Sequence, residues 1–133
     1  MAGWDDVRRI ALALPEAEER PSYGGNASWR VRDKLFAWER PLRSSDREAL
    51  GEAAPDGPIL GVRVEHLLAK EVVLAAGDVY FTTPHFDGYS AVLVVLDRIA
   101  MPELEEVITE AWLVRAPVRL ARAYLEARGE ARG

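Results

Sequence analysis

The chain has 133 residues, 49% of them hydrophobic and 29% charged, which is enough for one domain with a proper core and too few for two. Its formal net charge of -5 argues against a strongly charged nucleic-acid binder, because affinity for phosphate comes mainly from lysine and arginine. It has no cysteine, which excludes disulfides, thiolate nucleophiles and zinc sites of the cysteine type.

The sequence carries no targeting or membrane signal. No apolar run reaches the roughly 18 residues that a membrane span needs. The segment from Met1 to Asp6 lacks the basic start and the apolar stretch of a signal peptide. We therefore expect a cytoplasmic protein with no membrane partner. We also expect a single domain over residues 1–128 and a frayed tail over residues 129–133.

The first half of the chain predicts a helix, a loop and a hairpin. Apolar residues recur at helical spacing from Trp4 to Leu14, and Pro15 ends the run. Residues 16–26 are rich in Glu, Pro and Gly and predict a loop. The predicted strands of the hairpin span residues 27–32 and 35–40, around a turn at 33–34.

A two-residue turn would place Trp29 opposite Trp38. Side chains alternate between the two faces of a strand, so Arg30 and Arg32 would then project from one face of the hairpin. The residues expected on the other face, which we predict to be buried, are Trp29, Val31, Phe36 and Trp38.

The second half predicts alternating strands and helices. Residues 41–58 are polar and irregular, with one helical turn at 45–50. Asp87-Gly88 predicts a tight hairpin turn. The remaining predicted elements are a strand at 59–64, a helix at 65–76, strands at 79–82 and 90–97, a helix that Pro102 opens, and a last helix from Pro117 to about Arg128.

In the helix over 65–76 we expect Leu67, Leu68, Val72 and Ala75 to face inward. The order of elements is helix, hairpin, strand, helix, two strands and two helices. This order predicts an α+β fold in which an antiparallel sheet is packed against helices on one face.

Several segments, in this order, resemble the MmcQ/YjbR-like family of small bacterial domains. The resemblance spans nearly the whole chain and implies a compact fold of the double-wing or CyaY-like type, together with the description of a DNA-binding protein. The segments that carry it are residues 13–17 (ALPEA), Tyr23-Gly24, Trp29, residues 34–37 (KLFA), residues 83–89 (TPHFDGY), residues 110–112 (EAW) and Ala116-Pro117.

The DNA-binding function that the resemblance implies would be weak and non-specific. We expect its contacts to come from Arg30, Arg32 and Lys34 on one hairpin and from His85 and Tyr89 on the other. An alternative basic stripe consists of Arg115, Arg119 and Arg122, whose spacings of four and three place them on one side of a helix. Ordinary solvated arginines would give the same spacing.

The acidic composition favours a second hypothesis, a module that binds a small molecule or a protein. Its pocket would lie near Tyr23, Trp38, His85 and Trp112.

The chain lacks the motifs of common catalytic sites: it has no GxGxxG, P-loop, GxSxG or HExxH pattern. His85 is the best candidate for chemistry, because histidine changes charge near neutral pH. A metal site needs three or four ligands, and no histidine or cysteine lies at ligand spacing from His85. We therefore expect no enzymatic activity, no catalytic residue, no metal and no cofactor. We expect His85 to tie the Asp87-Gly88 turn by hydrogen bonds, and His66 to be an exposed residue at a helix start.

Overall fold

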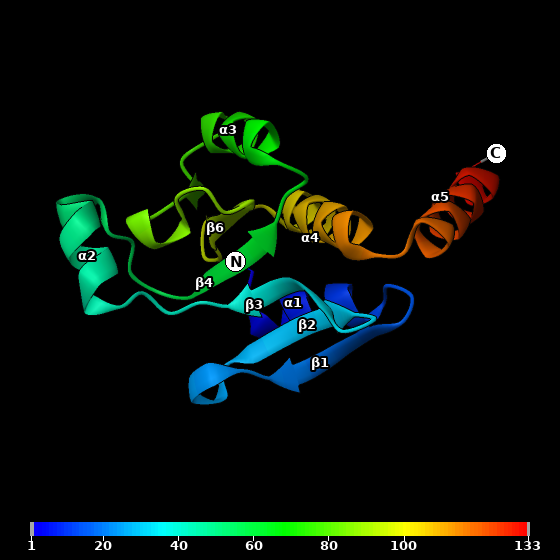
Figure 1. Ribbon diagram of the computed structural model, residues 1–133, viewed down its shortest axis with the longest axis horizontal. Coiled ribbons are helices and arrows are strands. Elements are labelled where there is room, and N and C mark those ends of the chain that lie inside the picture. Colours follow the sequence, from blue (N-terminus) through cyan, green and yellow to red (C-terminus); the bar gives the residue numbers. More distant parts are fainter. Residues whose placement is uncertain (1, 133) are drawn as a thin grey trace.

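The structure is a computed structural model that describes the backbone of residues 2–132 and all their side chains except those of Tyr23 and residues 130–132 (Figure 1). The helices and strands follow one another as α1 (Trp4–Leu12), β1 (Ala17–Pro21), η1 (Tyr23–Gly25), β2 (Ala27–Val31), β3 (Lys34–Glu39), α2 (Ser44–Leu50), η2 (Gly51–Ala53), β4 (Ile59–Arg63), α3 (Leu67–Ala75), β5 (Tyr80–Phe81), η3 (Pro84–Phe86), β6 (Ala91–Val95), α4 (Met101–Arg115) and α5 (Val118–Arg132), where η marks a 3-10 helix.

The strands form one six-stranded sheet in the order β1-β2-β3-β4-β6-β5, and neighbouring strands are antiparallel. The predicted α+β class is therefore confirmed. None of the described helices is both long and apolar enough to cross a membrane.

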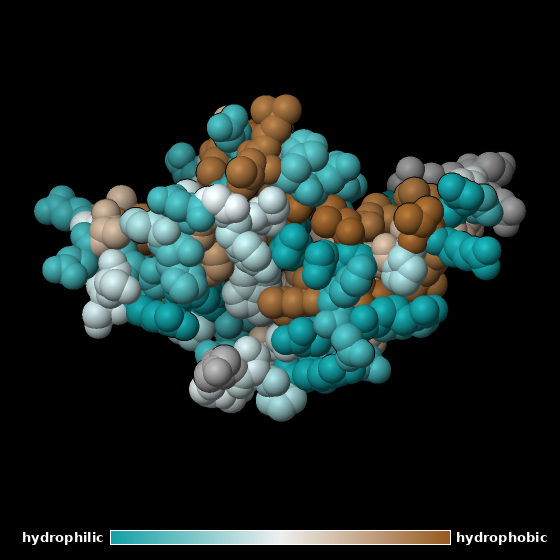
Figure 2. Space-filling model, in the orientation of Figure 1, coloured by the Kyte–Doolittle hydropathy of each residue, from teal (hydrophilic) through white to brown (hydrophobic). Residues whose placement is uncertain are grey.

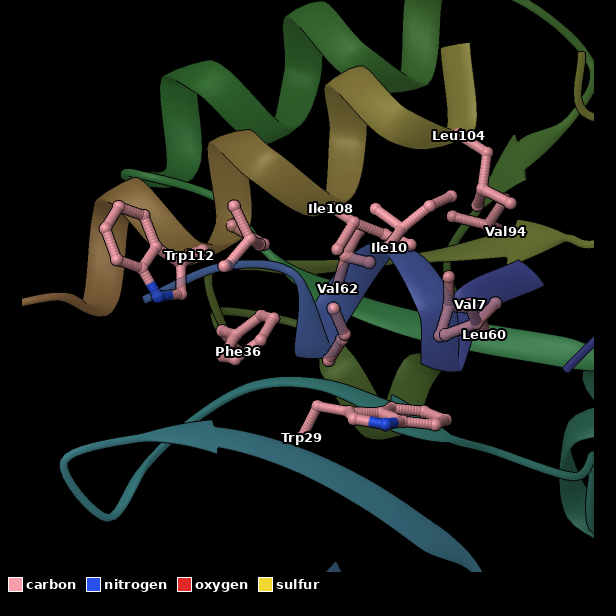
Figure 3. Packing of buried hydrophobic residues seen from close by; sticks show 14 of the residues in the cluster. Val7, Ile10, Trp29, Phe36, Leu60, Val62, Val94, Leu104, Ile108 and Trp112 are labelled. Atoms are coloured by element: carbon pink, nitrogen blue, oxygen red, sulfur yellow. The ribbon is translucent and has the colours of Figure 1, made fainter. Parts of the chain in front are cut away.

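The main core lies between one face of the sheet and helices α1 and α4. Trp29 lies below α1, and Trp112 of α4 packs toward Phe36 (Figure 3). A second, smaller apolar cluster lies on the opposite face of the sheet, where the short helix η3 supplies Phe86. The long helices thus cover one face, as predicted, and a loop segment covers the other.

The predicted hairpin register is wrong, because the turn comes one residue earlier and β3 bulges. The turn is formed by Arg32 and Asp33, which both have positive φ angles (50° and 68°), as in the type I′ turn of two-residue hairpins. Trp29 pairs with Ala37 while its neighbour Arg30 pairs with Leu35, so Phe36 is the extra residue of the bulge.

The bulge moves Trp38 to the opposite face of the sheet. Trp29 and Phe36 lie in the main core, whereas Trp38 lies in the second cluster. Both tryptophans are buried, as expected, but they do not share a face.

Strand β1 falls where the sequence predicted a loop. It is an edge strand whose last four residues are exposed and mostly charged. The strand therefore lacks the alternation of apolar and polar residues from which strands are predicted. Glu19 pairs with Trp29 across the strands, and its carboxylate accepts hydrogen bonds from the Trp29 indole (3.0 Å) and the Arg8 guanidinium (2.7 Å). Polar contacts therefore hold this strand in place.

Helix α3 presents a different face to the core than predicted. All four residues expected inside are exposed, and Leu68 and Val72 are 64% and 66% accessible. The residues that face inward are Ala69, Lys70, Val73 and Leu74. Figure 2 shows the resulting apolar surface on α3 at the top of the molecule.

Helix α5 continues to Arg132, beyond the predicted end near Arg128, and extends away from the rest of the molecule in Figure 1. Gly133, the last residue of the predicted frayed tail, lies outside the described residues. The predicted tight hairpin at Asp87-Gly88 is also wrong, because nine residues that include η3 separate β5 from β6.

Gly61 gives Trp38 the space for its ring. The two residues are paired across β3 and β4, and a Cβ atom at Gly61 would lie 2.3 Å from the indole. We expect Gly61→Ala to displace Trp38 and to lower the free energy of unfolding by about 1–3 kcal/mol, as overpacking does. Urea unfolding followed by tryptophan fluorescence measures this change. Gly77→Ala is the control, because a Cβ atom there meets nothing within 4 Å; equal losses in both variants would contradict the packing argument.

Candidate functional site

A hollow of about 720 Å³ lies on the second face of the sheet, between β3 and the segment that contains η3. Its volume falls in the range of small-molecule sites. The residues that line it are Ser22, Gly24, Asn26, Leu35, Trp38, Glu39, Arg40, Pro41, Leu42, Arg43, His85, Phe86 and Tyr89.

The segment over residues 83–90 forms one wall of the hollow. Pro84 starts η3 at a favoured first-turn position, and the 3-10 turn directs Phe86 toward the sheet. Asp87 (φ -60°, ψ 131°) and Gly88 (φ 75°) follow in a type II turn, which the amide of Tyr89 closes by donating to the carbonyl of Phe86 (3.0 Å). Gly88 is needed here for its positive φ angle.

Aromatic rings meet around Phe86. Its ring centroid lies 6.2 Å from Trp38, 6.1 Å from Tyr89 and 4.9 Å from His85, which it contacts edge to face. Trp38 and Phe86 are mostly covered, while Tyr89 and His85 are exposed. The hollow thus has aromatic rings at its base and polar groups at its rim.

A buried ion pair supports the same wall. Arg40 Nη2 lies 3.0 Å from Asp46 Oδ2, both side chains are almost completely buried, and the Arg40 guanidinium also lies 5.3 Å from the Phe86 ring centroid. Burial alone would raise the pKa of the Asp46 carboxyl, but the amide of Arg43 (2.8 Å) and the charge of Arg40 lower it below its ordinary value. Arg40, which directly follows β3, is thus in contact with both α2 and η3.

Lys70 fixes the turn after η3. Its buried ammonium donates hydrogen bonds to the carbonyls of Phe86 (2.7 Å) and Tyr89 (2.9 Å). Burial lowers the pKa of Lys70, and the nearby charge of Asp87 opposes that shift. A lysine inside a predicted helix gives no sequence signal for this role, because its partners lie 16 and 19 residues away.

His66 has the role expected from the sequence, and His85 does not. His85 is exposed and forms no hydrogen bond within the described part of the chain, so it does not tie the Asp87-Gly88 turn; Lys70 does so instead. His66 caps α3 as the exposed residue expected there, and its Nδ1 accepts a hydrogen bond from the amide of Ala69 (3.0 Å).

The cations expected to contact DNA lie at the hairpin turn and differ in their partners. The Nε and Nη2 groups of Arg32 donate hydrogen bonds to the two carboxylate oxygens of Glu16, and this hydrogen bonding lowers the pKa of the Glu16 carboxyl. Arg30 donates to the carbonyl of Asp33 (3.4 Å), and Lys34 is exposed. His85 and Tyr89 lie on the wall of the hollow, whereas Arg30, Arg32 and Lys34 lie near the hairpin turn.

The alternative basic stripe does not form on one helix. Arg115 is the last residue of α4, and the chain becomes extended at Ala116 before α5 begins. Arg119 and Arg122 are exposed on α5. Arg115 therefore does not share a helix with the other two arginines.

Among the predicted pocket residues whose side chains are described, Trp38 and His85 line the same hollow and Trp112 does not. Trp112 is buried in the main core on the other face of the sheet, where its indole donates to the carbonyl of Pro15 (3.1 Å) and contacts Tyr124. The Tyr23 side chain lies outside the described residues. Other residues complete the lining of the pocket at Trp38 and His85, among them Leu42 and Phe86.

We expect Asp46→Asn to lower the free energy of unfolding by about 3 kcal/mol or more, because it leaves Arg40 buried without its charged partner. Asp56→Asn is the control: Asp56 is fully exposed beside Arg47, and its loss should change stability by less than about 0.5 kcal/mol. The lowered pKa of Asp46 stabilises the fold above the ordinary value of 3.8, and this increment is lost as the pH falls through the lower folded-state pKa. Urea unfolding at pH 7 and below pH 4 should show the wild type losing stability that the variant never had. An acid sensitivity that is the same in both proteins would contradict this assignment.

We expect Lys70→Met to lower the free energy of unfolding by about 1–2 kcal/mol, because it removes a buried donor while each carbonyl keeps a backbone amide. Lys34→Met is the matched control, since Lys34 is the other lysine of the chain and is exposed. Denaturant unfolding compares the two variants. Amine labelling followed by mass spectrometry should also modify Lys34 rapidly and Lys70 slowly, and equal labelling rates would contradict the buried position.

Comparison with known proteins agrees with this fold. The family model described as YjbR matches residues 12–114. Uncharacterized proteins of Mycobacterium bovis and Mycobacterium tuberculosis are each 54% identical over 129 residues, which cover 94% of this chain and 97% of the relative. The crystal structure of a Deinococcus radiodurans protein with a DUF419 domain is similar in fold, with a TM-score of 0.62 at 19% identity over 86% of this chain and 78% of that one. This chain therefore belongs to the YjbR family, as its resemblance to the MmcQ/YjbR-like proteins predicted.

Proposed function

We propose that this YjbR domain is a non-enzymatic module that binds a small molecule in the hollow on the second face of its sheet. The observation that carries the proposal is the hollow of about 720 Å³ itself, in which the mostly buried rings of Trp38 and Phe86 form an aromatic base below the exposed His85 and Tyr89. Two buried polar interactions, at Asp46 and at Lys70, hold the surrounding segments in place. Such preorganisation reduces the ordering that a ligand must impose.

The lining indicates the chemistry of the ligand. Trp38, Phe86 and Leu42 suit a flat and largely apolar body. His85, Glu39 and Arg43 at the rim can hydrogen-bond to groups at the edge of such a molecule. The Arg40 guanidinium is already paired with Asp46, so it adds no free charge to the base.

The geometry around His85 supports a binding role over a catalytic one. A general base or nucleophile is normally oriented by a second side chain. In the described residues no side chain hydrogen-bonds to His85, and no group of three or more histidine, aspartate or glutamate side chains is arranged to hold a metal ion. His85 is therefore proposed as a ligand contact at the rim.

Weak DNA binding is the second candidate function. It is supported by Lys34, which is exposed and has no ion pair with a described residue, and by the exposed ring of His85. It is weakened by the ion pairs that hold Arg32 to Glu16 and Arg20 to Asp33 (2.6 Å), because these carboxylates would have to release their partners to phosphate.

The tryptophan indole signals in a ¹H–¹⁵N NMR spectrum test the proposal directly. On titration with indole, quinoline or salicylate, the Trp38 signal should shift, whereas Trp29 and Trp112 on the other face of the sheet should not. The double variant His85→Ala, Arg43→Ala should weaken the binding of these probes at least threefold. The control is Glu48→Ala, which replaces an exposed residue of α2 outside the hollow.

Unchanged Trp38 signals with every probe, or equal shifts at all indoles, would contradict the proposed site. A labelled DNA duplex titrated at low salt forms the second arm of the experiment. Salt-dependent anisotropy that disappears on substitution of Arg30, Lys34 and His85 would favour the DNA-binding function over the small-molecule one.

A further inference from the structure

A groove of about 320 Å³ lies between α3 and α4. Apolar side chains form much of its lining, and glutamates stand around them. The residues that line it are Arg63, Val64, Glu65, Ala69, Val72, Val73, Ala76, Tyr80, Glu103, Glu106, Val107, Glu110 and Val114. The groove shares no lining residue with the proposed binding hollow, so it is a separate surface of the molecule.

Helix α3 gives the groove an exposed apolar edge. Val72 lines the groove, and Leu68 lies one helical turn before it; both side chains are largely accessible. Figure 2 shows apolar surface over α3 and also over the start of α5, on the same side of the molecule. Large apolar side chains that stay exposed next to one another are typical of interaction surfaces.

The charge of the groove is negative. Its four glutamates and one arginine give the lining a net charge of -3. Glu106 and Glu110 are exposed, lie four positions apart on α4 and form no ion pair within the described part of the chain. Like charges at this spacing repel each other along a helix. An occupant that is both apolar and positively charged would therefore suit the groove.

Helix α5 carries a surface of the opposite character. Leu120, Ala121 and Tyr124 pack against the main core of their own chain. On another side of the helix, Val118 and Leu125 are 72% and 51% exposed. They lie seven positions apart, so they share one face of the helix.

Arginines accompany this apolar stripe. Arg122 follows Val118 by four positions and precedes Leu125 by three, which places all three on one face. Arg122 and Arg119 are exposed, and neither forms an ion pair with a described residue. Over residues 118–129, α5 carries three arginines and one glutamate. The exposed side of α5 is thus apolar and positive, as the groove is apolar and negative.

The two surfaces also agree in length. A helix rises about 1.5 Å per residue, so Val118 and Leu125 lie about 10 Å apart along α5, and Glu103 and Glu110 lie about the same distance apart along α4. Helix α3, with nine residues, is about 13 Å long. The stripe of α5 can therefore lie along the groove over its whole length.

The helix that would fill the groove belongs to another copy of the chain. No described residue of α5 lines the groove of its own chain, and α5 extends away from the rest of the molecule (Figure 1). Val114, four positions before α5 begins, lines the groove, so helix and groove adjoin in each copy. A two-fold axis can then bring each helix to the groove of the other copy, which buries every contact twice.

We propose that two copies of this chain form a symmetric dimer in which α5 of each lies in the α3–α4 groove of the other. The apolar stripe at Val118 and Leu125 packs on Val72, and Arg119 and Arg122 face the glutamates of the groove. The pairing leaves the binding hollow open and does not depend on its function.

Sedimentation velocity over a concentration series tests this pairing. We expect the wild type to pass from monomer to dimer as its concentration rises. The double variant Arg119→Glu, Arg122→Glu should associate at least tenfold more weakly, because acidic side chains then face the acidic groove. The matched control is Lys34→Glu, Arg98→Glu, which changes the net charge equally at two exposed cations outside the helix and the groove.

Three results of this series would overturn the proposal. The first is a wild type that stays monomeric up to about 1 mM. The second is an equal loss of association in both double variants. The third is a ladder of species larger than the dimer, which would show head-to-tail assembly in place of a two-fold pair.

A mixing experiment separates a lost contact from a damaged fold. The variant Glu106→Arg, Glu110→Arg has a basic groove and should remain monomeric alone. Mixed with Arg119→Glu, Arg122→Glu, it should form heterodimers, because one contact is the wild-type pair and the other joins an acidic helix to a basic groove. Two misfolded variants would not restore each other. A mixture that stays monomeric would overturn the reciprocal arrangement.

Disulfide cross-linking tests the position of α5 directly. The chain has no cysteine, so Val72→Cys and Leu125→Cys introduce one thiol each. Two cysteines form a disulfide only when their Cα atoms come within about 7 Å. We expect an oxidised mixture of the two variants to yield a dimer linked between positions 72 and 125, identified by peptide mass spectrometry. Glu48→Cys on α2 replaces Val72→Cys in the control; equal yields in both mixtures would overturn the proposal.

Discussion

The buried ammonium of Lys70 is the contact on which the second face of the sheet depends. It joins α3 to the turn after η3 through the carbonyls of Phe86 and Tyr89. Without a donor from outside, that turn would have only its own backbone hydrogen bonds to keep Phe86 against Trp38. A buried lysine is retained only where its ammonium is well satisfied, and two carbonyl oxygens at 2.7 and 2.9 Å meet this condition. The same contact explains why α3 turns Leu67 and Leu68 outward: the helix must direct Lys70 inward.

The main core could be predicted from the sequence because its signals are local. The helical spacing of Leu104, Ile108 and Trp112 and the uninterrupted apolar run of β6 correctly indicated buried elements. The hairpin register could not be predicted, because it depends on a bulge at Phe36 and on a turn in which Arg32 and Asp33 adopt positive φ angles. Strand β1 was missed for a related reason: it is fixed by the contact of Glu19 with Trp29 and not by hydrophobic alternation.

The candidate site was partly predictable. The aromatic residues around Asp87-Gly88 lie near one another in sequence, so His85, Phe86 and Tyr89 could be expected to meet. Trp112 could not be excluded, since the sequence does not show on which face of the sheet a helix packs. Arg40 with Asp46, Lys70 with Phe86, and Arg63 with Tyr89 are contacts between separate elements. Their partners are chosen by the tertiary fold, and no local pattern marks them.

The distribution of charge says more about this domain than its net value of -5. Near the hairpin turn two of the cations are paired, Arg32 with Glu16 and Arg20 with Asp33, while Lys34 has no ion pair with a described residue. Arg63 and Arg115 are half-buried and have no carboxylate within ion-pair distance among the described residues, although the chain carries more carboxylates than cations. Carboxylates at Glu65 and Glu110 are nearby, so the absence of an ion pair there reflects geometry and not a shortage of acidic residues. Cations that are partly paired and spread over an acidic chain give little attraction for an extended polyanion, which favours the small-molecule function over the DNA-binding one.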